Sequence, residues 1–551
     1  MGYEREVFLT RPAFLGPLRN ITYRRLWAAT TMSSLGTLIQ AVGAAWLMTT
    51  LTTSQTMVSL VQASNTLPIM AFSLIAGALA DTYNRRRILI FAQMAMVLAS
   101  AALAVTAWMD GLTPWMLLGF TFLIGCGSAL YNPSWQASMG DIVPRDDLHN
   151  AISLNSLSFN MMRSIGPAAG GVIVAVAGPS AAFVINMVLT LPLIRELTRW
   201  RPDYPGSDLP PEDIGAAIGA GLHYILMSPA LLKVLLRGAI FGTGAVTTLA
   251  LLPLVARDTM QGTALTYGVL LGTFGLGAIG GGIANTRLKQ HLSNEAVIRI
   301  AFTGYALAML VLGFANSMVL ACLALLVAGA CWVMALALLN VTVQLSTPRW
   351  VVGRALSFYQ TATFGGMALG SWLWGSVAEA HGLPTAFVVA AALLTVGGLL
   401  GLWLPLAAFP EDDLGPLGRF RPPTPMIDIK PRSGPIMVMI DYDIGLNDTP
   451  RFLALMRERR RIRLRDGARQ WTLMRDIERP ETWIESYHVP TWIDYMRHNQ
   501  RRTTADADNL NQLNALHRGL QGPQRVHRLI ERQTVPLTDD LPPVTSGTID
   551  I

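Results

Sequence analysis

An acid followed within six residues by three bases is the first pattern in the chain that could do chemistry. Residues 77–87 have the sequence Gly-Ala-Leu-Ala-Asp-Thr-Tyr-Asn-Arg-Arg-Arg, so Asp81 precedes Arg85, Arg86 and Arg87. A carboxylate in such a position can pair with an arginine or face the N-terminus of a neighbouring helix. Gly77 allows a second helix to approach closely. Together these residues predict a charged latch between helices.

A second pattern combines small residues with a proline at positions 166–171. Gly166, Gly170 and Gly171 would let helices touch closely, and Pro167 removes a backbone hydrogen bond and bends a helix. The pattern predicts a tight contact that controls leakage between two groups of helices. Ordinary packing of small residues is the alternative interpretation.

Polar side chains within apolar runs are the candidates for binding a substrate. Arg163 is the single strong ionisable case, and no acid lies in the middle of an apolar run. Arg163 would either compensate charge on a substrate or at a gate, or extend toward water. The neutral candidates would line a cavity for a polar substrate or bond helix to helix. They are Gln40, Gln62, Asn65, Asn132, Gln136, Asn155, Gln344 and Gln360.

The elements that hold these residues are apolar and long. Hydrophobic residues make up 52% of the chain and charged residues only 14%, against about 25% charged in soluble domains. Apolar runs of roughly 20 residues are long enough to cross a bilayer. The sequence predicts twelve such spans near 26–50, 56–80, 88–109, 114–137, 150–177, 180–198, 231–256, 265–286, 296–315, 318–343, 354–379 and 384–407.

The bases between the spans predict the orientation. They gather at every second joint, as at Arg85–Arg87, Arg145 and Arg195, whereas Arg257 is the clear exception on the opposite side. Lysine and arginine accumulate on the cytoplasmic side of membrane proteins. We therefore expect a multi-pass protein of the bacterial inner membrane with both termini in the cytoplasm.

An internal repeat relates the two groups of six spans. Shifting the chain by 204 residues places Gly125 on Gly329, Gly171 on Gly375 and Gly178 on Gly382. Ala-Phe-Val at 182–184 likewise falls on Ala-Phe-Val at 386–388. Two homologous six-span halves of the same orientation are typical of alternating-access carriers, whose binding site lies between the halves.

The chain after the spans has a different pattern. Strands are predicted at 436–442, 471–477, 483–489 and 525–533, with helices at 449–463, 490–501 and 506–517. The order βαββαβ predicts a ferredoxin-like domain. The predicted fold class is an all-α membrane protein with twelve transmembrane helices in two six-helix repeats, followed by a C-terminal α+β domain. The expected divisions are 1–198, a cytoplasmic loop 199–230, 231–407, a linker 408–435, the domain 436–535 and a disordered tail 536–551.

The motifs resemble those of known transporters. Residues 77–87 resemble the major facilitator signature, with Thr82 where a base is usual and Asn84 where glycine is usual. We expect Asn84 to support the turn because asparagine tolerates a left-handed conformation. Residues 166–171 resemble the antiporter motif of exporters in this superfamily. The segment 125–171, with Asn-Pro-Ser-Trp-Gln-Ala at 132–137, resembles the enterobactin-exporter group.

This resemblance implies a secondary active transporter that exports a siderophore-like or other amphipathic small molecule by alternating access. Proton coupling is implied by the resemblance alone. The expected partners are the substrate and the lipid bilayer, with the proton as a candidate coupling ion, and the sequence predicts no nucleic acid partner.

The C-terminal run from Trp471 through Trp483 to Trp492 resembles antibiotic-biosynthesis-monooxygenase-like domains, which form dimeric barrels. That resemblance implies His488 or Trp492 as catalytic candidates, but one histidine without partners makes a poor catalytic site. We expect a regulatory or dimerising domain whose exposed sheet faces, rich in Trp and Ile, form a homodimer. The chain is therefore predicted not to be an enzyme and to have no catalytic residue, cofactor or metal. The alternatives are a membrane-tethered monooxygenase-like enzyme, or a transporter gated by ligand binding to its soluble domain.

Overall fold

The computed structural model describes residues 13–201, 214–348, 350–406, 420, 422–519 and 524–531. Its contacts divide the chain into two compact units. The helix bundle comprises Met1–Ile214, Ala230–Val343 and Leu356–Ala408. The sheet unit comprises Gly215–Pro229, Gln344–Ala355 and Phe409–Ile551. Each unit is described in turn.

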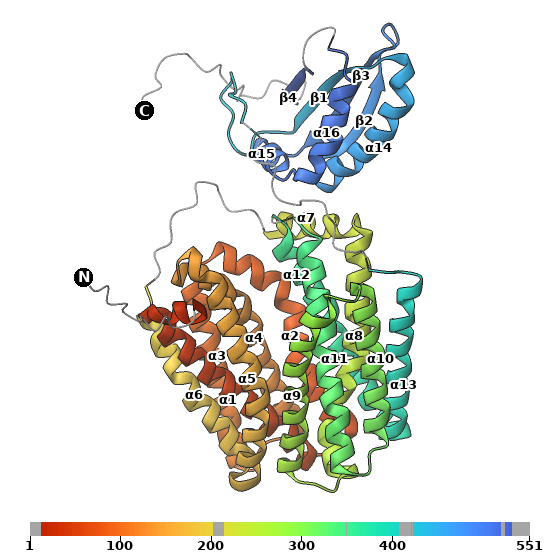
Figure 1. Ribbon diagram of the computed structural model, residues 1–551. Coiled ribbons are helices and arrows are strands. Elements are labelled where there is room, and N and C mark those ends of the chain that lie inside the picture. The colour runs from red at the N-terminus through yellow and green to blue at the C-terminus, as the bar shows by residue number, and fades with distance from the viewer. Residues whose placement is uncertain are drawn as a thin grey trace, which may run out of the picture. The chain divides into compact units, whose positions relative to one another are not determined.

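Long helices that run side by side make up the helix bundle (Figure 1). In the first half, the 3₁₀ helix η1 (Ala13–Arg19) precedes six helices. These are α1 (Ile21–Leu51), α2 (Gln55–Thr82), α3 (Arg85–Trp108), α4 (Pro114–Ile142), α5 (Arg145–Ala177) and α6 (Pro179–Arg199). The short helix α7 (Ile214–Leu226) lies in the stretch expected to be a loop.

The second half of the bundle repeats this arrangement. Its helices are α8 (Pro229–Leu254), extended by the π-helix η2 (Val255–Thr259), α9 (Ala264–Leu288), α10 (Asn294–Gly313), α11 (Met318–Leu345), α12 (Val352–His381) and α13 (Leu383–Leu399), with the 3₁₀ helix η3 (Leu400–Leu402) at its end. Within the described residues, eleven helices are long and apolar enough to cross a membrane. The one predicted span outside this set, near 354–379, corresponds to α12, whose 30 residues suffice in length but include more polar side chains.

Equivalent glycines make equivalent contacts in the two halves. A Cβ atom built on Gly125 would lie 2.9 Å from the Pro68 side chain, so α4 packs closely on α2. A Cβ atom on Gly329 would collide with the carbonyl oxygen of Phe274, so α11 packs closely on α9. These two helix pairs are related by the same shift of 204 residues that relates the sequences. The predicted duplication is thus visible in the packing.

The last joint of each half also repeats. Gly178 ends α5 with φ of 80°, and Gly382 ends α12 with φ of 86°. Glycine adopts positive φ without the steric cost that a Cβ atom imposes. Both turns are followed by a proline in the first turn of the next helix, where its missing N–H costs nothing.

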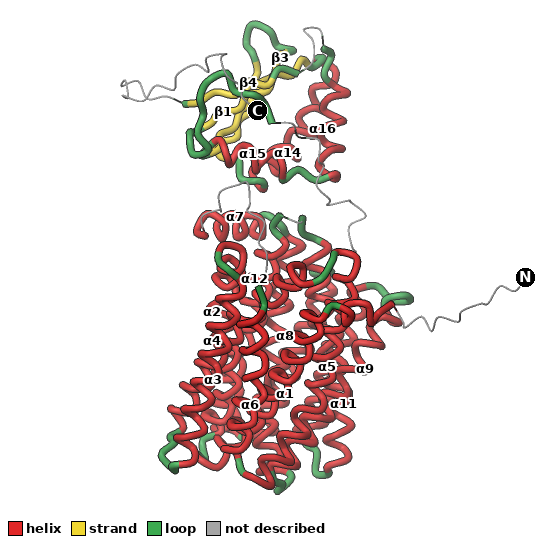
Figure 2. Tube along the Cα trace, turned by 90° about the vertical axis from the view of Figure 1, so that its left-hand side faces the viewer, coloured by secondary structure: helices red, strands yellow, loops and turns green. Residues whose placement is uncertain are grey.

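The sheet unit contains the predicted α+β domain (Figure 2). Its elements are β1 (Ile436–Asp443), the 3₁₀ helix η4 (Leu446–Asp448), α14 (Thr449–Arg465), β2 (Arg469–Arg475), β3 (Thr482–Val489), α15 (Trp492–Gln500), α16 (Thr504–Leu516) and β4 (Val526–Ile530). The four antiparallel strands have the order β2-β3-β1-β4. This strand order is that of the predicted ferredoxin-like fold, and the succession is βαββαβ with two helices, α15 and α16, in the second helical connection.

The helices of this domain pack on one face of the sheet. Alternate residues of β1, among them Val438 and Tyr442, are buried against α14, α15 and α16. Trp483 is opposite Tyr442 in the register and also faces the helices, and Trp471 donates its Nε1–H to buried Glu485. The expectation of an exposed sheet face rich in tryptophan is therefore wrong. The uncovered face instead presents Met437, Met439, Met474, Ile484 and Leu529.

Candidate functional site

The arginines of the first motif begin helix α3. Asn84 is the N-cap of this helix, and its side chain accepts a hydrogen bond from the backbone N–H of Arg87. Its φ of −62° is an ordinary extended value, so the expected left-handed turn is wrong. Asparagine suits the position because it caps helices well. The surroundings of Gly77 and of the Asp81 side chain lie outside what the structure describes.

Arg85 and Arg86 fasten α3 to two other helices of the first half. Arg85 Nη1 is 2.9 Å from Asp141 Oδ2 in the last turn of α4 and also donates to the Ala137 carbonyl. Arg86 donates to the carbonyl groups of Leu197 and Thr198 at the end of α6. A base at these free carbonyls satisfies them and interacts well with the helix dipole. The motif thus fixes one end of the half-bundle.

The small residues of the second motif lie at two helix contacts. Gly166 and Gly170 in α5 face Leu38 and Val42 in α1. Gly171 faces the other half: a Cβ atom there would lie 2.8 Å from Gly268 Cα in α9. Pro167 lies inside α5, whose helix continues past it.

The contact between α5 and α9 continues along both helices. A Cβ atom on Gly275 would lie 2.8 Å from Ser164 Cα, and one on Gly272 would lie 3.4 Å from Ala168 Cβ. We call this contact the α5·α9 seam. Backbone meets backbone along it, so it joins the halves through van der Waals contact.

An equivalent seam joins α2 to α12. Gly375, the counterpart of Gly171, packs against Ser59. Ser73 Oγ and Thr361 Oγ1 are 2.8 Å apart toward the end of α2. At the other end, Glu379 accepts hydrogen bonds from Ser54 Oγ at 2.9 Å and the Thr56 N–H at 3.0 Å. Both ends of this α2·α12 seam are bridged by polar contacts.

Arg163 lies near the middle of α5, beside these contacts. Its guanidinium carbon is 5.9 Å from the centroid of the Trp332 ring in α11. Phe241, Phe274 and Tyr305 surround that ring at centroid distances of 5.9 to 6.2 Å. A guanidinium over an indole face is attracted by the ring quadrupole. The second half thus presents an aromatic cluster to a cation of the first half.

One neutral candidate belongs to a buried network inside the first half. Gln40 Oε1 accepts from Ser100 Oγ at 2.9 Å and from the Asn186 side chain. Asn186 is itself next to Thr190, whose hydroxyl is 3.3 Å from Ser33. Gln40 therefore bonds helix to helix, as neutral polar residues in membranes often do.

The other neutral candidates are distributed over several helices. Asn155 accepts from Trp135 Nε1 at 3.1 Å, which joins α5 to α4. Asn65 donates to the Val61 carbonyl of its own helix. Asn132 and Gln136 are exposed one turn apart on α4. Gln62 and Gln360 are half-buried and Gln344 is exposed, on α2, α12 and α11 respectively.

Two arginines have structural roles that the sequence patterns did not predict: Arg237 was not singled out, and Arg257 was named only as an exception to the charge pattern. Arg237 in α8 is 2% exposed and forms a two-pronged pair with Glu295 at 2.9 and 3.0 Å. Arg257, the exception to the charge rule, donates to the Thr49 carbonyl at the end of α1 at 2.7 Å and so links the halves. Glu295 and Thr49 are each distant in sequence from the arginine that they contact. The pairing of Arg237 could have been indicated only by noticing a base in one span together with an acid at the start of another.

The two catalytic candidates of the C-terminal domain lie apart. His488 is opposite Met437 on the uncovered side of the sheet. Trp492 begins α15 and stacks on Tyr495, with ring centroids 5.2 Å apart. Within the described residues, no cluster of three His, Cys, Asp or Glu side chains could hold a metal ion.

Comparisons with known proteins agree with this geometry. The sequence model of the transmembrane secretion effectors, a major facilitator family, matches residues 13–534. The multidrug efflux pump Tap of Mycolicibacterium fortuitum is 25% identical over 335 residues, which cover 58% of this chain and 80% of the pump. The enterobactin exporter EntS of Citrobacter koseri is 27% identical over 297 residues, which cover 53% of this chain and 67% of the exporter.

Solved transporters share the fold at low sequence identity. An auto-inhibited peptide transporter of the POT family matches with a TM-score of 0.60 at 14% identity, covering 73% of this chain and 99% of the transporter. A bacterial homologue of the lysosomal transporter Spinster, in an inward-facing and unoccupied conformation, matches with a TM-score of 0.56 at 14% identity, covering 70% and 97%. The bundle therefore has the fold of these transporters.

Proposed function

The chain belongs to the transmembrane secretion effector family of major facilitators, and we propose that it exports a siderophore-like or other amphipathic small molecule by alternating access. The observation that carries the proposal is the pair of equivalent seams, α5·α9 and α2·α12. Small residues let the halves slide and rock against each other, and the few polar bridges can break one end at a time. The family and the named relatives are transporters, so the tethered-enzyme alternative is not retained.

The surroundings of Arg163 support the proposal that the substrate carries an anionic aromatic group. A guanidinium within a bundle needs a partner of opposite charge to offset the cost of leaving water. Among the described residues, Arg163 has an aromatic neighbour and no hydrogen bond or ion pair to an acid. A planar oxyanion can bind such a group through two parallel hydrogen bonds, and the rings around Trp332 can contact the apolar body of the same molecule.

Asp81 is proposed to close the gate at the end where α3 begins. Arg85 and Arg86 already fix that end of the first half to α4 and α6. We propose that the Asp81 carboxylate, four residues before Arg85, holds a partner from the second half.

The same bases support the proposed orientation. Arg85, Arg86 and Arg87 would face the cytoplasm of a bacterial inner membrane, which places both termini there. Arg257 does not weaken this orientation, because its guanidinium is engaged by Asp258 and by the Thr49 carbonyl.

We further propose that the proton is the coupling ion. We also propose that the uncovered methionine-rich face of the sheet, with Met474 and Leu529 exposed by 42% and 48%, joins two copies of the chain.

A deletion strain tests the export proposal. Its culture medium, profiled against that of the parent strain, is expected to lack a secreted compound with an acidic aromatic group. Wild-type chain should restore the compound, whereas an Asp81→Asn variant inserted at the same level should not. An unchanged medium would contradict the export proposal. Restoration by Asp81→Asn at the wild-type rate would contradict the latch assignment.

A further inference from the structure

A cavity of about 700 Å³ lies within the C-terminal domain, between the covered face of the sheet and its helices. Val438 and Ile440 of β1 and Val526 of β4 form an apolar wall. Tyr487 and Tyr495 contribute rings, and Asn499 contributes an amide. Cavities of roughly 300–1,000 Å³ that combine apolar walls with a few polar groups are typical of small-molecule sites.

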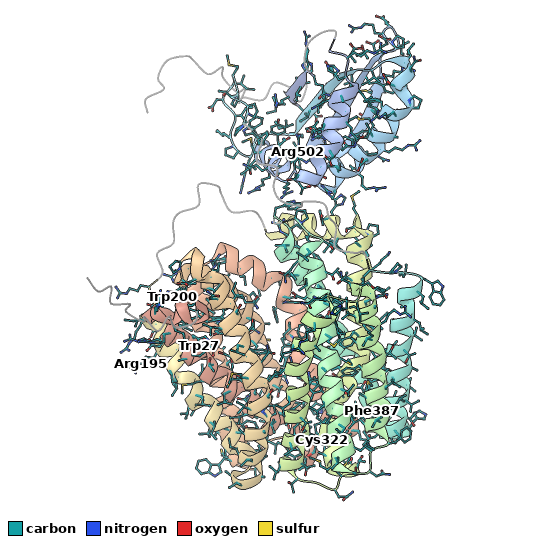
Figure 3. All side chains as sticks on the ribbon, in the orientation of Figure 1. Trp27, Arg195, Trp200, Cys322, Phe387 and Arg502 are labelled. Carbon is teal, nitrogen blue, oxygen red and sulfur yellow. The ribbon has the colours of Figure 1, made fainter. Side chains whose placement is uncertain are left out.

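The cavity is lined by four arginines. Arg459 and Arg463 come from α14, Arg502 follows α15, and Arg528 lies on β4; Figure 3 labels Arg502. No acidic side chain is among the described residues of the lining. The carboxylate of Glu485 is fully buried and pairs with Arg463 at 3.0 Å and with Arg459 at 3.7 Å.

Glu485 cannot satisfy all of these cations. Its two oxygens also accept from Tyr442 Oη and Trp471 Nε1, at 2.9 and 3.1 Å. Within the part of the chain that the structure describes, Arg459 Nε and Arg463 Nη2 are buried without a hydrogen-bond partner, and their residues are 3% and 1% exposed. A buried donor without a partner destabilises the fold, and a charged one does so more strongly. The hydrogen-bonding capacity of this arginine group therefore exceeds what Glu485 and its other neighbours use.

The surroundings of Arg502 show the same excess of positive charge. Burial, together with the guanidinium groups of Arg463 and Arg459, lowers the pKa of Arg502 to about 10. Its side chain bonds to the amide oxygen of Asn499, which is neutral. An anion in the cavity would relieve this repulsion.

We propose that this cavity is a binding site for an anionic aromatic small molecule, whose carboxylate or similar planar oxyanion is bound by Arg459, Arg463 and Arg502. Its ring lies against the apolar wall and Tyr495. Arginine suits such a group because its fork matches two oxygens at once. The site stands on the geometry of the C-terminal domain alone and is independent of the proposed export.

Titration calorimetry of the purified full-length chain tests this site. The probes are 1-naphthoate and its neutral isostere 1-naphthamide. We expect naphthoate to bind and naphthamide to bind about tenfold more weakly or not at all, since the amide has no negative charge and only one oxygen for the arginine fork. Arg459→Gln and Arg502→Gln should each weaken naphthoate binding by about tenfold.

Arg460→Gln is the matched control, because Arg460 is exposed on the same helix, and it should leave naphthoate binding unchanged. The Arg502→Gln variant is expected to stay folded, because the substitution removes one cation from a group of like charges. Absence of naphthoate binding below about 1 mM, equal binding of the amide, or unchanged binding in both cavity variants would overturn the proposal. If the wild-type chain binds naphthoate but exports no compound, the result contradicts the transport proposal and leaves the cavity proposal standing.

Discussion

Arg163 is the residue on which the substrate assignment depends most. It is half-buried in the middle of α5, with its guanidinium over Trp332. We expect Arg163→Ala to reduce secretion of the exported compound at least about tenfold, through loss of a charge-assisted contact of about 1.5–3 kcal/mol. Arg163→Lys should restore only part of it, because lysine lacks the planar fork. The measurement is the rate of secretion per amount of inserted protein.

Arg195→Ala provides the control, since Arg195 is an exposed base on α6. Its secretion rate should match the wild type. Full secretion by both Arg163 variants would show that this side chain has no part in binding.

Asp466 makes the stability of the C-terminal domain depend on pH. It is 2% exposed, and burial raises its pKa from 3.8 to about 6 even though Arg465 lies beside it. The folded domain therefore holds more protons than the unfolded chain between these values, so its stability falls as pH rises through about 6, by up to about 1.4 kcal/mol per pH unit.

We expect Asp466→Asn to remove this dependence. Hydrogen–deuterium exchange of the α14 and β3 amides between pH 4 and 7, corrected for intrinsic exchange, measures the free energy of opening. The same slope in wild type and variant would show that another group is responsible.

Among individual residues, the sequence indicates those whose type is unusual for their surroundings. Arg163 is a base within an apolar run, and Gly166, Gly170 and Gly171 are clustered small residues, so both could be singled out. The role of Arg237 could not, because its partner Glu295 is 58 residues away and only folding brings them together. The excess of arginine in the C-terminal cavity likewise arises from three elements that are separate in sequence.

Among the elements, α5 and α9 make a backbone contact that joins the two halves. Gly171→Ala would place a methyl group 2.8 Å from Gly268 Cα and 2.9 Å from the Ala264 carbonyl oxygen. Backbone atoms on both sides cannot move aside as a side chain can, so the halves must separate along this seam. We expect export to fall severalfold while the amount of inserted protein stays near normal.

Gly119→Ala is the matched control, because no atom lies within 4 Å of its added methyl group. It should export like the wild type. Normal export by Gly171→Ala, measured beside this control, would mean that the seam tolerates separation and does not govern transport.

The order of elements could be predicted, but the orientation of some could not. Run length and charge position indicated every long helix of the bundle, whereas the 13 residues of α7 are too few to span a membrane and were expected to be loop. Alternation indicated the strands β2 and β3 but not which face would be covered. Trp483 faces inward because it is opposite Tyr442 and packs on Phe452, which is a consequence of register.

In the whole molecule, transport is expected to depend on the helix bundle and not on the C-terminal domain. The residues assigned to the gate, the seams and the substrate all precede residue 382. A chain cut after residue 410 is therefore expected to insert and to keep at least part of its export activity. The measurement is secretion by the deletion strain that expresses the shortened chain. Normal insertion with complete loss of export would make the C-terminal domain part of the transport cycle.

Alternating access requires the halves to separate along the α2·α12 seam, and a cross-link across this seam tests that requirement. In a chain whose Cys126, Cys322 and Cys331 are replaced by alanine, Ser73→Cys and Thr361→Cys would stand where two hydroxyl groups are 2.8 Å apart. Oxidation is expected to join α2 to α12 by a disulfide and to stop export, and reduction is expected to restore it, because this end must open in each cycle. Export that continues at the original rate in fully cross-linked protein would contradict the account.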